Sequence, residues 1–272
     1  MSGVLYVVAT PIGNLDDITR RGADVLASVQ IVAAEDTRRS QVLLAAIGAS
    51  PTELISFHAH NEQNVAQRLM SALHEGADVA LVSDAGTPLV SDPGFDLIRR
   101  CWEEDVRVVP VPGPSSVLAV LSVCPLPAGR FLFEGFLPAK AGQRRERLRH
   151  LAGRTEAVVF FEAPHRVADC LSDLERLVPQ RRLMVGREMT KRHESLYCGT
   201  PEDLREALKG TLRGEFVFVM EAAAGSGLEA DAAEVMEILC SELAPAQAAR
   251  IGARLLKADR AALYKMALER RS

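Results

Sequence analysis

The sequence predicts an α/β protein in which a parallel sheet carries the functional loops. Apolar, β-prone runs at residues 4–9, 79–82 and 106–109 each stop at a loop rich in proline, glycine and hydroxyl side chains. The segment 82–94 is much longer than an ordinary strand-to-helix turn of roughly 2 to 6 residues. Because the carboxyl ends of parallel strands meet at one edge of a sheet, the three loops are expected to converge on one cleft.

The first of two α/β domains is expected at residues 1–124, where strand and helix signals alternate. A helix beginning at Ser115 or Ser116 would bury the apolar run after the third loop, because serine is a favoured N-cap residue. Asn61 is likewise expected to cap a helix that begins near Glu62. Apolar residues at helical spacing indicate three further helices: Ile18, Val25, Leu26 and Val29; Val65, Leu69, Ala72 and Leu73; and Leu97, Ile98, Cys101 and Trp102.

A second α/β domain is expected at residues 130–224. A hinge is expected at residues 125–129, because two prolines there prevent a helix or strand from continuing. The second domain is expected to begin directly after this hinge. A helix is indicated by Val167, Cys170, Leu171, Leu174 and Leu177. The β-prone runs predict a mixed sheet with strands at residues 131–136, 157–161, 183–187, 195–198 and 215–221.

A small helical segment is expected at residues 231–272, after a flexible connection at residues 222–227. Its apolar pattern predicts three short helices, and Asp259 is the expected N-cap of the last. The arrangement is typical of a helix-turn-helix that binds RNA. A packing or dimerisation module is the alternative.

The three loops of the first domain also indicate the chemistry of their ligand. They contain no Lys or Arg, but they are rich in free carbonyl groups, hydroxyls and carboxylates. The glycine-rich signatures of P-loop and dinucleotide-binding proteins and the nucleophile elbow of serine hydrolases do not occur. The sequence therefore favours a neutral or cationic ligand that is contacted mainly by backbone groups.

Seven short segments resemble the tetrapyrrole-methylase family, and several of them are typical of the members that act on ribosomal RNA. They are residues 10–15 (TPIGNL), 35–38 (EDTR), 57–62 (FHAHNE), 83–88 (SDAGTP), 112–116 (PGPSS), 161–166 (FEAPHR) and 186–191 (GREMTK). The resemblance implies two α/β domains of the tetrapyrrole-methylase type, with the donor site in the cleft between them. It also implies S-adenosylmethionine-dependent 2′-O-methylation of a cytidine in the decoding region of small-subunit (16S) ribosomal RNA. Ala59 departs from the pattern, which puts in doubt a role for that side chain only.

The resemblance also assigns residues to the methyl donor, most of them through backbone atoms. The implied donor-binding residues are Pro11, Asp84, Gly86, Thr87, Val90, Ser115, Ser116, Glu162, Ala163, Met189 and Phe216. No metal is expected. His58 and His60 would share one face of a strand, but no third or fourth ligand is evident.

The catalytic candidates are Lys191, Glu188 and Asn14, which would act on the 2′-hydroxyl group of the RNA. That hydroxyl is a poor acid, so a nearby cation that stabilises the developing alkoxide could serve as well as a base. Lys191 could play either part, because neighbouring cations or burial could lower its pKa. His165 and Arg166 are expected to contact the RNA substrate.

Two basic segments indicate a polyanionic partner. The net charge is −4 overall, but residues 140–154 and 246–272 each carry +5, which leaves −14 on the remainder. Single-sign clusters of this kind suit RNA binding, whereas solvated structural helices usually intersperse both charges. The expected partners are the small ribosomal subunit with its 16S rRNA and a second copy of the chain. The expected phosphate contacts are Arg144, Arg145, Arg260 and Lys265.

The composition and the positions of the prolines and cysteines limit the classes of protein that the sequence can represent. The uncharged stretch at residues 108–129 is broken by five prolines, and no signal peptide is recognisable, so a cytoplasmic protein without a membrane span is expected. The five cysteines are scattered and are expected to be core thiols. Two alternatives stay open: a tetrapyrrole (precorrin-type) C-methyltransferase, which leaves the basic segments unexplained, and a non-catalytic RNA-binding ribosome assembly factor.

Overall fold

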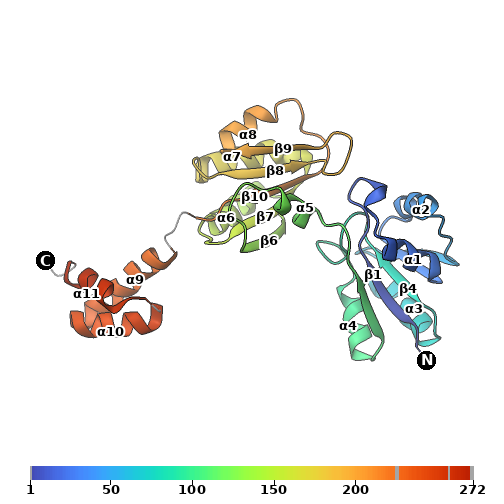
Figure 1. The fold of residues 1–272 in the computed structure, drawn as a ribbon, viewed down its shortest axis with the longest axis horizontal. Coiled ribbons are helices and arrows are strands. Elements are labelled where there is room, and N and C mark those ends of the chain that lie inside the picture. Colours follow the sequence, from blue (N-terminus) through green and yellow to red (C-terminus); the bar gives the residue numbers. More distant parts are fainter. Residues whose placement is uncertain (1, 224–226, 257, 270–272) are drawn as a thin grey trace.

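The structure is a computed structural model that describes residues 2–223, 227–256 and 258–269. Two sheets, each covered by helices, are followed by a group of three C-terminal helices (Figure 1). Among the described residues, no helix is long and apolar enough to cross a membrane.

The first sheet is entirely parallel, as predicted, with the strand order β3-β2-β4-β1-β5. Its central strands are buried on both faces, which explains their continuous apolar sequences. The strands are β1 (Val4–Val8), β2 (Ile31–Ala34), β3 (Glu53–Ser56), β4 (Val79–Val82) and β5 (Arg107–Val111). The connecting helices are η1 (Leu15–Asp17), α1 (Arg20–Ser28), α2 (Thr37–Ala46), α3 (Glu62–His74) and α4 (Phe95–Glu103).

Two details of the first domain differ from the sequence-based expectation. Strand β5 continues through Pro110 to Val111, because it is the edge strand and the missing N–H of proline costs no ladder hydrogen bond there. Helix α3 does begin at Glu62, but the Asn61 side chain does not cap it. Instead, the Asn61 amide accepts a hydrogen bond from the His58 N–H and donates one to the Ser56 carbonyl, both at 2.8 Å.

The second sheet is mixed, as predicted, with the strand order β6-β7-β10-β8-β9. Only β6 and β7 are parallel neighbours. The strands are β6 (Phe131–Phe136), β7 (Ala157–Glu162), β8 (Leu183–Arg187), β9 (Ser195–Gly199) and β10 (Phe216–Met220). The helical elements of this part are α6 (Ala141–Ala152), η2 (Pro164–Arg166), α7 (Val167–Leu177) and α8 (Pro201–Ala207).

Helix α5 (Ser116–Ser122) joins the two sheets. Ser115 caps it by accepting the Leu118 N–H, as the sequence indicates. Its buried Val117 and Val120 pack with Val159 and Val217 of the second sheet. A helix that the sequence places in the first domain therefore covers the second sheet, and it lies beside β10 in Figure 1. The domain limits 1–124 and 130–224 stay a prediction.

The C-terminal helices are α9 (Gly227–Glu242), α10 (Pro245–Leu256) and α11 (Arg260–Glu269), which share a small core that includes Met236, Ala248 and Leu263. The first helix begins at Gly227, earlier than the expected Asp231. Asp259 caps the last helix by accepting the Ala262 N–H at 3.1 Å. Residues 224–226 of the expected connection, together with Lys257, Arg270 and Arg271, lie outside the described residues.

Candidate active site between the two sheets

A hollow of about 390 Å³ lies between the two sheets, which we call the interdomain hollow. The loops after β1, β4 and β5 line it from the first domain, and the ends of β6, β7, β8 and β10 line it from the second. Its volume falls in the usual range of small-molecule sites. Ten of the eleven donor residues implied by the sequence line this hollow: Asp84, Gly86, Thr87, Val90, Ser115, Ser116, Glu162, Ala163, Met189 and Phe216. Pro11 instead lines a neighbouring hollow.

Hydrogen bonds between the loops hold the first-domain side of this hollow together. Thr10 and Gly86 exchange two backbone hydrogen bonds of 2.9 Å, which ties the β1 loop to the β4 loop. Gly86 has a φ of +86°, a conformation that a side chain makes unfavourable. The Thr87 hydroxyl donates to the Pro114 carbonyl at 3.2 Å and ties the β4 loop to the β5 loop. The three strand-end loops are therefore connected into one wall.

The same wall is acidic. Glu35, Asp84 and Asp92 line the hollow, and sequence reasoning missed Glu35 and Asp92, although both stand in segments that it singled out. Burial, with a smaller contribution from the Asp84 charge, raises the pKa of Glu35. Burial and the charge of Glu35 raise the pKa of Asp92 to about 6. The cation among the described lining residues is Arg39, which lies 3.4 Å from the Asp84 carboxylate. The hollow therefore suits a ligand that carries positive charge.

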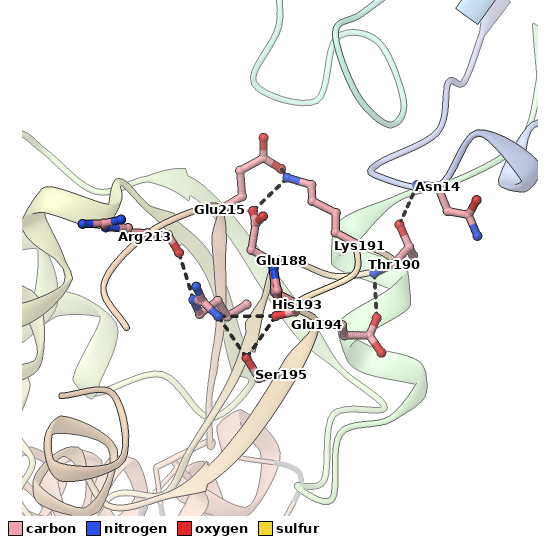
Figure 2. A network of polar contacts seen from close by, with 10 residues as sticks. Asn14, Glu188, Thr190, Lys191, His193, Glu194, Ser195, Arg213 and Glu215 are labelled. Carbon is pink, nitrogen blue, oxygen red and sulfur yellow. Dashed lines mark hydrogen bonds and ion pairs between the residues drawn. The ribbon is translucent and has the colours of Figure 1, made fainter. Parts of the chain in front are cut away.

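Lys191 and Glu188, two of the catalytic candidates, form an ion pair on the second-domain side (Figure 2). The Lys191 Nζ lies 2.8 Å from Glu188 Oε1 and 3.1 Å from Glu215 Oε2. Burial by itself would lower the pKa of Lys191, but the hydrogen bond to Glu188 and the charge of Glu215 outweigh it and raise that pKa. The pKa of Glu188 is lowered, because Lys191 and the Glu215 N–H outweigh its own burial. Lys191 is thus held as a cation, which disfavours its use as a base.

Asn14, the third catalytic candidate, connects the two domains through its backbone. Its N–H donates to the Thr190 hydroxyl at 3.2 Å, and its side chain accepts the Asp16 N–H and points away from Lys191 (Figure 2). The preceding Gly13 lies so close to the second domain that an added Cβ would stand 2.3 Å from Cγ of Lys191. Asn14 therefore positions the loop that carries Lys191, and no contact directs its side chain toward the hollow.

Two predicted substrate contacts, Arg144 and Arg166, form ion pairs within the second domain, and their contact with RNA stays a prediction. Arg144 is buried, and its guanidinium lies 2.9 Å from the equally buried Asp173 carboxylate. Arg166 lies 2.6 Å from Glu162 Oε1 with only 16% of its side chain exposed. The protein interior covers the Arg144 guanidinium, whereas part of the Arg166 side chain remains exposed. His165, Arg260 and Lys265 are exposed, and Arg145 is half-exposed, so these four stay available to RNA.

No group of three or more His, Cys, Asp or Glu side chains is placed to hold a metal ion within residues 2–223, 227–256 and 258–269. His58 and His60 form an edge-to-face ring contact, with their centroids 6.0 Å apart.

Comparison with known proteins identifies the family. Residues 4–205 match the Tetrapyrrole (Corrin/Porphyrin) Methylases, and residues 226–271 match the RsmI C-terminal HTH domain. Three relatives are named ribosomal RNA small subunit methyltransferase I. The one from Xylella fastidiosa is 45% identical and covers 96% of this chain and 98% of its own. Those from Escherichia coli O157:H7 and Haemophilus influenzae are 42% and 41% identical, each over 98% of this chain and 95% and 97% of their own.

Solved structures confirm the two-domain α/β fold that the sequence predicts. Uroporphyrin-III C-methyltransferase from Thermus thermophilus, complexed with S-adenyl homocysteine, matches 80% of this chain and 97% of its own, with a TM-score of 0.59 and 20% identity. Diphthine synthase matches 80% of this chain and 90% of its own, with a TM-score of 0.62 and 14% identity. Fold and sequence agree: the chain belongs to the tetrapyrrole methylase family and, within it, to the ribosomal RNA small subunit methyltransferase I group.

Proposed function

We propose that this protein uses S-adenosylmethionine to methylate the 2′ oxygen of a cytidine in the decoding region of 16S ribosomal RNA. The observation that carries the donor assignment is the interdomain hollow, whose acidic wall complements a sulfonium and whose opposite wall is mostly apolar apart from Glu162 and Glu215. Phe136, Phe161, Met189 and Val217 supply that apolar surface for an adenine. The names and the extent of the full-length relatives support the ribosomal RNA substrate.

Methyl transfer depends mainly on how the 2′ oxygen is placed relative to the methyl group. S-adenosylmethionine supplies an already activated methyl group. In the transfer, the 2′ oxygen bonds to the methyl carbon, the methyl–sulfur bond breaks with its electrons remaining on sulfur, and the hydroxyl proton leaves to solvent. Holding the oxygen in line can supply on the order of 7 to 11 kcal/mol. In this proposal the Lys191 ammonium stabilises the negative charge that develops on the 2′ oxygen.

The donor assignment predicts that affinity depends on pH through Asp92. Because the pKa of Asp92 is about 6, its carboxylate forms as the pH rises through that value and then attracts the sulfonium. Between pH 5 and 7, the affinity for S-adenosylmethionine should therefore rise by at most about tenfold for each pH unit. Calorimetry with S-adenosylhomocysteine, which lacks the positive sulfur, is the matched control and should show a flatter profile. An Asp92→Asn variant with the wild-type profile would contradict the assignment.

The exposed basic side chains are proposed to hold the RNA rather than to take part in the chemistry. Removing one side chain that binds a phosphate should reduce the slope of log affinity against log salt by about 0.7. Truncation after Ala223 and the double change Arg145→Ala/Arg149→Ala should both flatten the slope for small ribosomal subunits. Arg99→Ala, on a first-domain helix where Arg99 pairs with Asp96, is the control that should leave the slope unchanged. A folded truncation with wild-type affinity and slope would make the C-terminal helices a packing module.

The test of the proposed function is label transfer from a radioactive donor. We expect label in the 16S ribosomal RNA of unmodified small subunits, at the 2′ position of a cytidine, and none in a tetrapyrrole precursor. Label in the tetrapyrrole would favour the C-methyltransferase alternative, and binding without any transfer would favour an assembly factor.

A cytoplasmic homodimer is part of the same proposal. Phe95 and Trp102 of α4, which are 70% and 74% exposed, supply apolar surface for such a contact, and light scattering would measure it.

A further inference from the structure

A second, smaller hollow lies beside the interdomain hollow, and the function proposed above assigns no ligand to it, although Pro11 and Asp84 of the implied donor residues line it. We call it the side hollow. It has a volume of about 240 Å³, and the β1 loop, helix α2 and the start of the β4 loop line it. The two hollows share Arg39 and Asp84. A molecule in the side hollow would therefore adjoin the same charged pair as a molecule in the interdomain hollow.

The shared pair is held in place by the fold. Asp84 Oδ1 accepts the Asp36 N–H at 2.8 Å, which orients the carboxylate, and Oδ2 lies 3.4 Å from the guanidinium of Arg39. Asp84 follows β4 directly, and Arg39 extends from α2 with 60% of its side chain exposed. One side of the guanidinium is thus accessible to a ligand, while its charge is already balanced.

The side hollow combines an apolar rim with a polar interior. Leu15 and Val42, which line the side hollow, are 41% and 59% exposed and so present apolar surface to a ligand there. Ser40, which also lines the side hollow, is only 6% exposed. Its hydroxyl can donate or accept a hydrogen bond, so the side hollow offers a polar group to the edge of a ligand.

These features suit one flat ring with a polar edge. The volume is below the roughly 300 to 1,000 Å³ of most small-molecule sites. Proteins that act on single-stranded RNA stack splayed-out bases on guanidinium planes and hydrogen-bond their edges. Enzymes that modify one nucleotide remove it from the stack into a close-fitting pocket.

We propose that the side hollow receives the base of the target pyrimidine nucleotide, with the Arg39–Asp84 pair as the wall between this base and the methyl donor. The inference rests on the proposed function and adds where the nucleotide binds. The base lies on the face of the Arg39 guanidinium, its polar edge meets the Ser40 hydroxyl, and Leu15 and Val42 cover its apolar surface. Its ribose then lies at the boundary of the two hollows, where the 2′ oxygen can face the donor.

Val42→Trp tests the inference, because Val42 lines the side hollow alone and its exposed side chain leaves room for a larger one without disturbing the core. The indole should fill the hollow, so kcat/KM for unmodified small subunits should fall by about 100-fold or more, the scale of a displaced reacting group. Affinity for S-adenosylmethionine should stay within twofold of wild type. Gln41→Trp places the same ring at the neighbouring exposed position of α2, outside both hollows, and should keep wild-type values.

Each outcome decides the inference. Unchanged methyl transfer by Val42→Trp would overturn it, and so would a loss of donor affinity in that variant, because the side hollow would then belong to the donor site. Equal losses in Gln41→Trp would also overturn it, because they would assign the effect to the surface of α2. If the wild-type protein transfers no methyl group to small subunits, the proposed function itself is refuted. Methyl transfer by the wild-type protein is therefore measured before the variants are compared.

Discussion

Lys191→Ala is expected to lower the turnover of methyl transfer by about 10²- to 10³-fold, the usual cost of removing one preorganised charge from a developing oxyanion. Affinity for S-adenosylmethionine should change little, since Lys191 does not line the interdomain hollow. Single-turnover kinetics on saturating small subunits, together with calorimetry of donor binding, would separate the two effects. Near-normal turnover would remove Lys191 from the chemistry.

The charge of Lys191, rather than its basicity, is the expected cause. Its pKa is raised, so it stays protonated throughout the neutral range, and its contribution should disappear only above the ordinary range of lysine. Lys191→Arg should therefore retain much more activity than Lys191→Ala. Lys209→Ala is a matched control, because Lys209 also pairs with a glutamate three residues away but lies on an exposed helix end. Lys191 would instead act as a base if the rate fell as the pH was lowered through an apparent pKa near neutrality. This pH dependence would then be absent in Lys191→Ala.

Arg144→Ala is expected to be the most destabilising change among the residues considered for RNA binding. It would leave the Asp173 carboxylate, of which 5% of the side chain is exposed, without its hydrogen-bonded partner at 2.9 Å. Breaking a buried pair in this way costs about 3 to 5 kcal/mol. Denaturant unfolding followed by circular dichroism would measure the loss.

Two controls separate this buried pair from the surface charges. Arg145→Ala should cost no more than about 1 kcal/mol, because Arg145 is 41% exposed and lies 3.8 Å from Asp173. The double variant Arg144→Met/Asp173→Leu should recover much of the stability, because it removes both charges together. If Arg144→Ala unfolds like wild type but binds RNA more weakly, Arg144 is an RNA contact after all.

Arg144 and Arg145 illustrate what the sequence could not predict, namely which of two neighbouring arginines is buried. Both stand in one basic run, and charge alone makes them equivalent. Helix α6 turns Arg144 toward α7 and Arg145 toward solvent, because successive residues of a helix point about 100° apart. The position of Asp173 on α7 then decides which guanidinium is buried, and that position depends on how the two helices pack.

Lys191 shows a second limit of the same kind. Its position in a charged loop suggested either a base or a cation, and a lowered pKa would have needed burial or a nearby cation such as Arg187 or Arg192. In the folded chain, Arg187 instead donates to the carbonyl of Arg213, and Glu215 from the start of β10 approaches Lys191. A residue 24 positions along the chain therefore acts together with Glu188 to raise the pKa of Lys191.

The sequence alone determined features that are local or repetitive. These are the strands with their continuous apolar runs, the caps at Ser115 and Asp259, and the loops with glycine and proline that follow three strands of the first sheet, β1, β4 and β5. Because the ends of parallel strands must share one edge, these patterns also predicted that the loops would meet. Only the tertiary structure decided which side chains pair across them. It placed Glu35 and Asp92 in one acidic wall and buried Arg144 against Asp173. It also set Arg39 and Asp84 between two hollows, because pairing energies depend on distances and burial that arise only when remote elements pack.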